Sequence, residues 1–299
     1  MSDDVVDPPP RCEAFPPTLA DLRFAAGTTY LLEVPTLDGL ELSSSDPAIV
    51  GIAPAATGEA FELTGGRAGA VTLTARCLES DRVVATAQVI AAPVASIELR
   101  YRAAPGANRP VVALAGLRGH ADSVQVIYRG NGGELLRGRG QFAVRGTAVT
   151  MIESSPRRLS DSFFSRSTAV ALEFAALGNA ELVASVAGGI ERVLPIEVVP
   201  APATLELVTM VLDNWTLVPA PSPVATGTFV GIAVIAKTAD GRYVSGVQAT
   251  WNVTPAVSIV DGSLSQESGE LVIAIGNPGP VAVTARAGTL TATREIIAQ

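Results

Sequence analysis

Apolar and polar residues alternate in three short segments that share one pattern. The segments are GAVTLTAR from Gly69, GNAELVAS from Gly178 and GPVAVTAR from Gly279, and each fits G-x-[VA]-x-[LV]-x-A. A period of two places every second side chain on one face, as in a β-strand with one buried face. Because the segments recur at a spacing of about one hundred residues, the pattern predicts an internal repeat of that length.

A second apolar strand follows each of these segments: ATAQVIA from residue 85, RVLPIEVV from 192 and TREIIA from 293. Each pair predicts a terminal hairpin. The first two hairpins are followed by similar phrases, SIELR at 96 and TLELV at 204, after the proline-bearing joints AAPVA and PAPA. Proline-rich joints of this length are semi-rigid. We therefore expect tandem domains in a line, with these limits: a flexible acidic, proline-rich tether 1–12, then domains 13–92, 93–200 and 201–299.

Turn residues separate the short strands inside the repeats. The Asp-Gly pairs in LDGL at 37 and ADGR at 239 are strong hairpin signals. After each comes a corner, SSSDPAIVGIA at 43–53 and the partial copy NVTPAVSIVDG at 252–262. Serine and aspartate side chains bond their own backbone at such corners, and proline fixes φ. The corners are therefore expected to be scaffold that leads the chain into the next buried strand.

Composition agrees with an all-β fold, because aromatic residues make up only 5% of the chain and Ala, Val, Thr and Gly take up the apolar and small positions, which suits many short strands with tight turns. The order of Asp-Gly turn, Ser-Asp-Pro corner and Gly-x-Val-x-Leu-x-Ala strand resembles the bacterial immunoglobulin-like domains, chiefly group 2. Trp251 falls near the tryptophan that such domains often carry. The middle repeat keeps the terminal hairpin and lacks the turn and the corner, and its long loop, 153–168, makes it divergent. The resemblance implies three tandem immunoglobulin-like β-sandwiches in an elongated, rod-like arrangement.

The net charge of -8 and the acidic pI near 4.8 argue against nucleic acid as a partner of the whole molecule. The charge is uneven, since 93–200 holds 12 basic and 9 acidic residues and the flanking thirds are acidic. No apolar run is long enough for a membrane span. The start MSDDVVDPPP lacks the features of a signal peptide and resembles the first residues of a mature exported protein. We expect a periplasmic, outer-membrane-anchored or extracellular location, with Met1 standing where a processed or lipid-modified residue would be.

The two cysteines, Cys12 and Cys77, allow two interpretations. They are either two unpaired thiols or a disulfide that closes a loop of about 65 residues and contributes about 4 kcal/mol in the chain-entropy model. Intact mass with and without reduction distinguishes these alternatives.

Residues that carry catalytic chemistry are scarce in the sequence. The only histidine, His120, lies in the polar turn LRGHADS and has no evident partner, so we expect a solvated loop residue. Neither zinc-ligand spacing nor a glycine-rich phosphate loop is present, and the two joints contain no carboxylate. Asp240 and Asp261 each stand beside glycine and are explained by turns. We expect no enzyme activity, no metal site and no cofactor.

The segment ESSPRRLSDSFFSRST at 153–168 fits the sandwich pattern least well, because it exceeds an ordinary hairpin loop. Its phenylalanines either pack into the middle domain or form an exposed cation-and-aromatic patch of the kind found at protein contacts. The patch interpretation gives these candidate partner-binding residues: Arg157, Arg158, Phe163, Phe164 and Arg166. Partners of suitable chemistry are other envelope or surface proteins, further copies of the chain, and anionic polysaccharide.

These observations, together with the resemblance, predict a non-enzymatic exported structural or adhesive module displayed on a bacterial envelope. One alternative is a subunit of a larger surface assembly or fibre. A second alternative is a carbohydrate-binding protein, although two tryptophans and four tyrosines are a small supply for a sugar platform.

Overall fold

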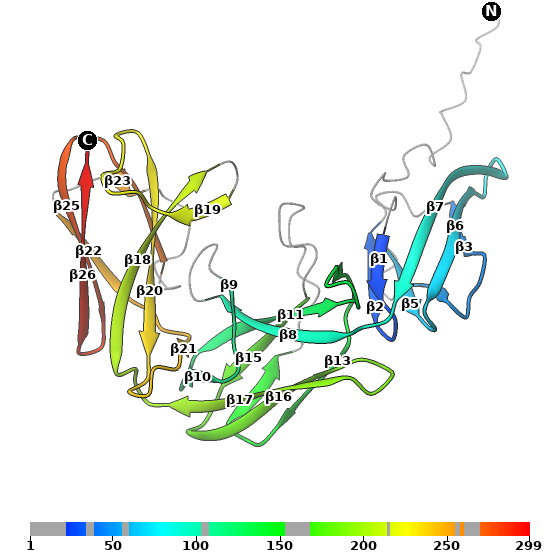
Figure 1. Cartoon of the computed structure of the whole chain (residues 1–299), viewed down its shortest axis with the longest axis horizontal. Helices are drawn as coiled ribbons and strands as arrows, with labels where there is room; N and C mark the ends of the chain where they lie inside the picture. Colours follow the sequence, from blue (N-terminus) through cyan, green and yellow to red (C-terminus); the bar gives the residue numbers. More distant parts are fainter. Residues whose placement is uncertain are drawn as a thin grey trace, which may run out of the picture.

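The computed structural model describes residues 22–33, 39–55, 60–102, 108–152, 168–213, 216–254, 258–259 and 270–299. Within these ranges all regular secondary structure is β, in strands labelled β1 to β26 (Figure 1). The strands form six sheets that pair into β-sandwiches. The predicted all-β fold class with tandem immunoglobulin-like sandwiches is therefore confirmed.

The N-terminal unit pairs the four-stranded sheet β1-β7-β6-β3 with the three-stranded sheet β2-β5-β4. Alternate side chains of β6, Val71, Leu73 and Ala75, are buried between the two sheets, as the period of two requires. The strands of this unit are β1 (Leu22–Ala25), β2 (Thr29–Glu33), β3 (Leu40–Ser44), β4 (Val50–Pro54), β5 (Ala60–Gly65), β6 (Gly69–Cys77) and β7 (Arg82–Ala92).

The middle unit is larger and pairs the sheet β14-β15-β11-β8-β9, with β12 on β11, with the sheet β13-β16-β17-β10-β21. Its core contains the fully buried rings of Tyr128 and Phe174. Its strands are β8 (Ser96–Arg102), β9 (Asn108–Pro110), β10 (Leu114–Leu117), β11 (Ala121–Arg129), β12 (Leu135–Leu136), β13 (Gln141–Arg145), β14 (Val149–Ile152), β15 (Thr168–Phe174), β16 (Gly178–Ser185) and β17 (Glu191–Val199).

The C-terminal unit pairs the sheet β19-β18-β20-β24-β23 with the sheet β22-β25-β26 around a core that includes Val230, Ile273 and Val283. One of its strands, β21, leaves the unit and joins a sheet of the middle unit. Its strands are β18 (Thr204–Asp213), β19 (Thr216–Pro219), β20 (Phe229–Lys237), β21 (Val244–Ser245), β22 (Thr250–Thr254), β23 (Ser258–Ile259), β24 (Glu270–Ala274), β25 (Gly279–Ala287) and β26 (Leu290–Ala298).

The three predicted terminal hairpins are present. Strands β6, β16 and β25 begin at Gly69, Gly178 and Gly279, the first residues of the repeated pattern, and each pairs with the next strand in antiparallel register. Strands β8 and β18 begin at Ser96 and Thr204, as expected. The domain limits drawn from the sequence stay predictions.

The corner at 43–53 carries the chain from β3 in one sheet to β4 in the other. Ser45 Oγ accepts the Thr72 N–H at 3.0 Å, and Asp46 Oδ1 accepts the Ala48 N–H at 3.0 Å. The serines and the aspartate thus satisfy backbone groups at the point where the sheet ladder stops. The corner is scaffold, as the sequence predicts, while parts of its copy at 252–262 lie outside the described residues.

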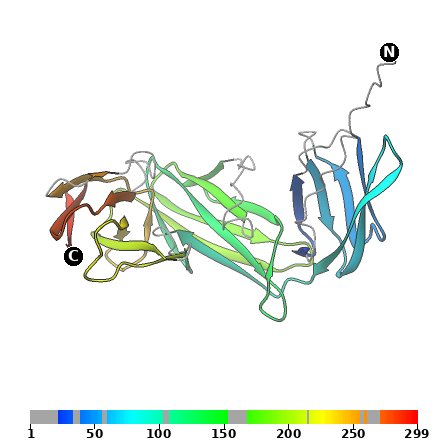
Figure 2. The same cartoon turned by 90° about the horizontal axis from the view of Figure 1, so that it is seen from above.

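The units follow one another along the longest axis of the molecule, and they lie in a row when seen from above (Figure 2). In the view of Figure 1 the two outer units rise from the same side of the middle unit. The tandem arrangement is therefore elongated but bent, with the shape of an open U. The bend arises at the two joints, where each outer unit meets the middle unit.

Candidate functional site

The residues predicted to bind a partner, Arg157, Arg158, Phe163, Phe164 and Arg166, all lie outside the described residues. Their segment connects β14 to β15, two neighbouring strands of the middle unit.

Cys77 is buried at the end of β6 and takes part in a disulfide. Cys12 lies outside the described residues, so its pairing with Cys77 stays a prediction.

Among the described residues, backbone hydrogen bonds connect neighbouring units at two joints. At the first joint, the segment Arg137–Arg139 after β12 lies along the edge of β1. Ala25 donates its N–H to Arg137 O at 2.8 Å, and Arg137 donates its N–H to Arg23 O at 3.1 Å. Thr29 and Arg139 exchange two further backbone hydrogen bonds of 3.0 and 2.6 Å. The middle unit thus supplies backbone partners to a sheet edge of the N-terminal unit.

The second joint repeats this arrangement one unit further along the chain. Strand β21 pairs in parallel with β10 in the register Ala115 with Val244 and Gly116 with Ser245. Ala115 donates its N–H to Tyr243 O at 2.9 Å. A small apolar cluster that includes Ala115, Ala236 and Val244 is buried between the two units. The C-terminal unit therefore completes a sheet of its predecessor.

Asp122 fixes the end of β21. Its Oδ2 accepts the Ser245 Oγ–H at 2.5 Å and the Gly246 N–H at 3.2 Å. Ser245 is only 1% exposed, so this carboxylate satisfies a hydroxyl that has lost contact with water. Gly246 has a positive φ and packs its backbone against His120, where an added Cβ would lie 2.8 Å from His120 Cβ. His120 was expected to be a solvated loop residue, and the structure instead places it half-buried at this joint.

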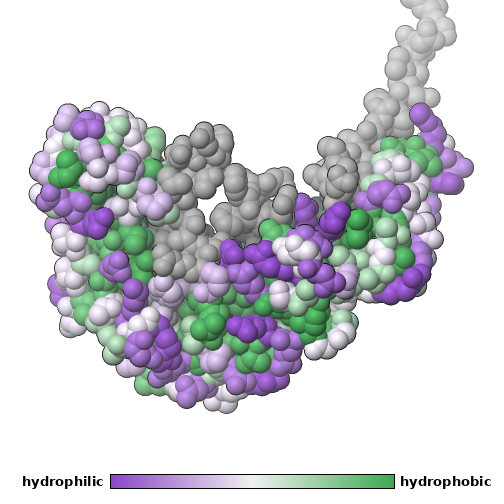
Figure 3. Space-filling model, in the orientation of Figure 1, coloured by the Kyte–Doolittle hydropathy of each residue, from purple (hydrophilic) through white to green (hydrophobic). Residues whose placement is uncertain are grey.

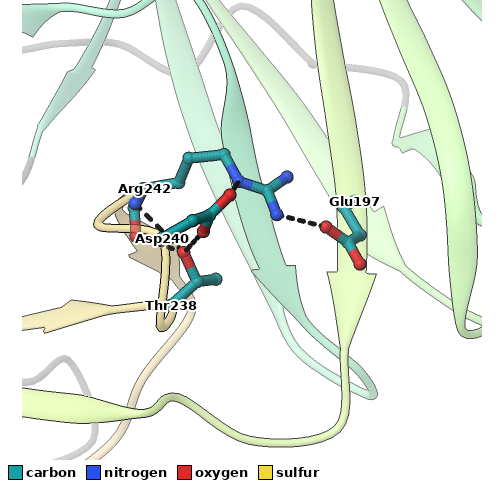
Figure 4. Close-up of polar contacts among 4 residues, drawn as sticks. All are labelled: Glu197, Thr238, Asp240 and Arg242. Carbon is teal, nitrogen blue, oxygen red and sulfur yellow. Dashed lines mark hydrogen bonds and ion pairs between the residues drawn. The ribbon is translucent and has the colours of Figure 1, made fainter.

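A polar network closes the outer side of the second joint (Figure 4). Arg242 of the C-terminal unit bonds Glu197 of β17 in the middle unit and, through Nε, Asp240 Oδ2 at 2.8 Å. Thr238 Oγ1 bonds the Asp240 carboxylate and accepts the Arg242 N–H at 3.0 Å. The bond to Glu197, more than that to Asp240, raises the pKa of Arg242, and the Thr238 bond holds the pKa of Asp240 below its ordinary value. The ADGR turn predicted from the sequence thus positions an interdomain cation.

Beside this network lies a shallow groove of about 370 Å³. The four charged side chains that line it are ion-paired, since Arg145 contacts Glu181 at 3.5 Å and Arg242 contacts Glu197. The groove is lined by Arg145, Gly146, Asn179, Ala180, Glu181, Pro195, Ile196, Glu197 and Arg242. A surface of paired, partly exposed charges such as this one is suited to polar contacts.

The part of the chain that the structure describes lacks two features. In that part of the chain, no cluster of three or more His, Cys, Asp or Glu side chains is arranged to hold a metal ion. Nor does it contain a helix long and apolar enough to cross a membrane.

The sequence did not reveal the joint residues. Repeats two and three each carry a short insert after a turn, residues 134–140 before β13 and residues 242–249 before β22, and the inserts contain the two-residue strands β12 and β21. In the first repeat Gly39 directly precedes β3. Both inserts contain a glycine with positive φ at the contact, Gly138 and Gly246. This difference in length between repeats was the available signal.

No family model matches the sequence, and no curated protein matches it. Among solved structures, domains 4–9 of the surface layer protein SbsC match with 16% identity, 92% of this chain, 39% of that chain and a TM-score of 0.38. Invasin, a bacterial integrin-binding protein, matches with 13% identity, 92% and 60% coverage and a TM-score of 0.26. The Escherichia coli adhesin FdeC matches with 14% identity, 93% and 94% coverage and a TM-score of 0.26.

The chain thus spans 39% of the SbsC fragment that it resembles. All three TM-scores lie below 0.5.

Proposed function

We propose that this protein is a non-enzymatic, exported structural or adhesive module, displayed on a bacterial envelope, whose bent shape holds its ends at a set distance and angle. The observation that carries the proposal is the backbone pairing across both joints. Linked domains normally move relative to one another unless the interface between them is large and apolar. Here a sheet edge of each preceding unit is completed by its successor, which opposes hinge motion.

Short connections support the same function. Strand β7 ends at Ala92 and β8 begins at Ser96, while β17 ends at Val199 and β18 begins at Thr204. Connections of this length, with proline in each, leave little freedom for rotation. A stiff spacer transmits position and force without a chemical step, which is consistent with the ion-paired groove described above.

The surface fits a displayed module of this kind. In the face drawn in Figure 3, polar and apolar residues are mixed in small groups over all three units. Large continuous apolar patches mark obligate interfaces or membrane contacts. An interspersed surface is suited to a protein that is exposed to solvent along its length.

Small-angle X-ray scattering of the full chain tests the stiffness. We expect one bent conformation to account for the profile and for the maximum dimension. A profile that requires a broad distribution of interdomain angles would contradict the proposal. Display on the envelope is tested separately, by antibody labelling of intact cells of the source bacterium, and labelling only after cell lysis would contradict that part.

We propose the segment 153–168 as the partner contact of this module, with Arg157, Arg158 and Arg166 as its cations. Replacing the three arginines by serine is expected to weaken binding to an anionic surface and to flatten its salt dependence. A control with the same charge change replaces three exposed arginines, one from each unit: Arg82, Arg192 and Arg294. Equal loss in both variants would mean that net charge, rather than this segment, carries the binding.

A further inference from the structure

The turn that receives the neighbouring unit occurs three times in the chain. We call it the receiving turn, and its copies are Phe24–Thr28, Gly116–His120 and Val224–Thr228. The glycine of each copy has a φ near +80° and donates its N–H to a carbonyl at or directly after the end of another strand. The acceptors are Gly65 O, Phe174 O and Ile275 O, at 2.9, 2.8 and 2.7 Å. The three copies also lie beside the last strand of their own unit in the same parallel direction, as shown by the pairs Phe24 with Ala91, Gly116 with Val198 and Val224 with Ala298. The three turns are therefore structurally equivalent.

The first two receiving turns are covered by the next unit. We call the covering inserts, residues 134–140 and 242–249, docking segments. In the first, Gly138 lies against Thr28, where an added Cβ would come within 2.0 Å of Thr28 Oγ1, and in the second Gly246 lies against His120. Thr28 and His120 occupy the same position in their turns. Both docking segments thus use a positive-φ glycine against the same place.

The third receiving turn is uncovered. Ala25, at the centre of the first joint, is 0% exposed, whereas its equivalent Ala225 is exposed, as are the three residues 221–223. Phe229 is 58% exposed at the position that corresponds to Thr29 of the first joint. In Figure 1 this surface belongs to the end of the C-terminal unit that carries the chain terminus and points away from the middle unit.

The backbone groups that correspond to those used in docking lie in the third turn and directly before it. At the first joint, Ala25 of the receiving turn offers a donor, its N–H, and Arg23, directly before the turn, offers an acceptor, its backbone O. Their equivalents are Ala225 N–H and Pro223 O, which form no hydrogen bond among those of the described residues. Pro223 has no N–H and so cannot repeat the bond that Ala115 donates to Tyr243 at the second joint. The third turn therefore matches a partner that bonds as Arg137 does.

We propose that this exposed surface, residues 221–229, docks a further immunoglobulin-like unit that carries a docking segment of the kind found at residues 134–140 and 242–249. The occupant follows from the two existing interfaces, which the third turn would repeat. A second copy of this chain is not the expected occupant. Its first repeat passes directly from Gly39 to β3 without a docking segment, and its two docking segments are already used within the chain. The proposal rests on the structural role proposed above and names the kind of partner that this role requires.

The test uses the intact protein labelled with nitrogen-15 and a synthetic peptide with the sequence of residues 134–141. We expect millimolar peptide to shift the backbone amide signals of Val224, Ala225 and Thr226, because Ala225 N–H gains an acceptor. The control peptide carries a methyl group on the backbone nitrogen of the residue equivalent to Arg137, which removes its one donor to Pro223 O. We expect this control to shift those signals much less.

Each possible result of these titrations either supports the proposed docking or contradicts it. Absence of shifts with the peptide, equal shifts with the methylated peptide, or shifts confined to residues outside 221–229 would each overturn the proposal. Titration with excess unlabelled full-length protein is expected to leave the same signals unchanged, and a shift there would replace the proposed occupant by a second copy. None of these results alters the scattering profile of the dilute protein, so failure of docking and failure of the stiff-spacer function are distinguishable.

Discussion

Gly138 shows how a single residue sets the contact between two units. Its φ of +127° is a conformation that side chains rarely adopt, and its Cα faces Thr28, a buried residue whose Oγ1 bonds Ala25 O at 2.6 Å. An added methyl group cannot be placed there unless the joint opens, because the Thr28 side chain is buried and its Oγ1 is bonded to Ala25 O. The close approach and the backbone conformation thus both require glycine.

Gly138→Ala is expected to destabilise the protein by about 1–3 kcal/mol, from backbone strain and from the clash with Thr28. The matched control is Gly133→Ala in the turn before β12, where φ is +78° and nothing lies within 4 Å of the added Cβ. The control carries the strain without the clash, so its loss should be smaller. Urea unfolding measures both, and faster amide exchange at Ala25 in Gly138→Ala alone would locate the effect. Equal losses in the two variants would show that the close approach is unimportant.

Tyr128 ties the same loop to the middle core and makes stability depend on pH. Its ring is fully buried, and its Oη accepts the Gly140 N–H at 2.8 Å. Burial raises the pKa of Tyr128 to about 12, although the Gly140 bond and the charge of Arg139 lower it in part. The unfolded chain therefore loses this proton near pH 10, before the folded chain does.

Stability contributed by the neutral phenol is fully present below pH 10 and is lost as pH rises towards 12. Two pKa units correspond to about 2–3 kcal/mol. Tyr128→Phe removes the titration and is expected to lower stability at pH 7 by about 1 kcal/mol through the lost hydrogen bond. Urea unfolding from pH 8 to pH 11.5 should show a smaller decline in the variant than in the parent. Parallel curves for the two proteins would refute this role.

At the scale of elements, the hairpins could be predicted from the sequence because their partners are neighbours in the chain. Gly69, Gly178 and Gly279 begin strands as the alternating pattern indicates. Strand β21 could not be predicted in this way, because a segment of two residues carries no periodicity and its partner, β10, belongs to another unit. The turn before β21 was predicted from Asp240 and the glycine that follows it. The pairing of the next strand with the middle unit was not predicted. The candidate site was missed for the same reason, since its contacts are not local.

The β10–β21 pairing is expected to depend on Asp122. Asp122→Ala leaves the buried Ser245 hydroxyl and the Gly246 N–H without their acceptor, which costs about 1–3 kcal/mol. Ser245→Ala removes the hydroxyl as well as its need for a partner and should cost less. The control Glu295→Ala deletes an exposed carboxylate from the C-terminal unit.

Amide exchange at Gly246, together with urea unfolding, measures these changes. Exchange should accelerate in Asp122→Ala and remain unchanged in Glu295→Ala. A variant Asp122→Ala that behaves like the control would show that main-chain pairing alone holds β21 in place.

At the scale of the whole molecule, each unit protects the edge of the one before it. Unpaired sheet edges favour unwanted association, and both interior joints remove such an edge by pairing it. The same geometry fixes the bend, because an edge pairing allows less rotation than a contact between side chains. Stiffness and protection of the edges are thus two consequences of one arrangement.

The contribution of charge to this shape can be separated from that of the backbone. The Arg242–Glu197 pair is partly exposed, with side-chain exposures of 31% and 40%, so its contribution is expected to be about 0.2–1 kcal/mol and to decrease with salt. In 1 M salt the screening length falls to about 3 Å, whereas backbone hydrogen bonds and buried apolar contacts persist. We therefore expect the same maximum dimension by small-angle scattering in 0.1 M and 1 M sodium chloride, and in Arg242→Ala. The double variant Asp122→Ala with Ser245→Ala should instead broaden the distribution of angles at the second joint. Loosening by salt or by Arg242→Ala alone would mean that ion pairs, rather than strand pairing, hold the molecule in its bent form.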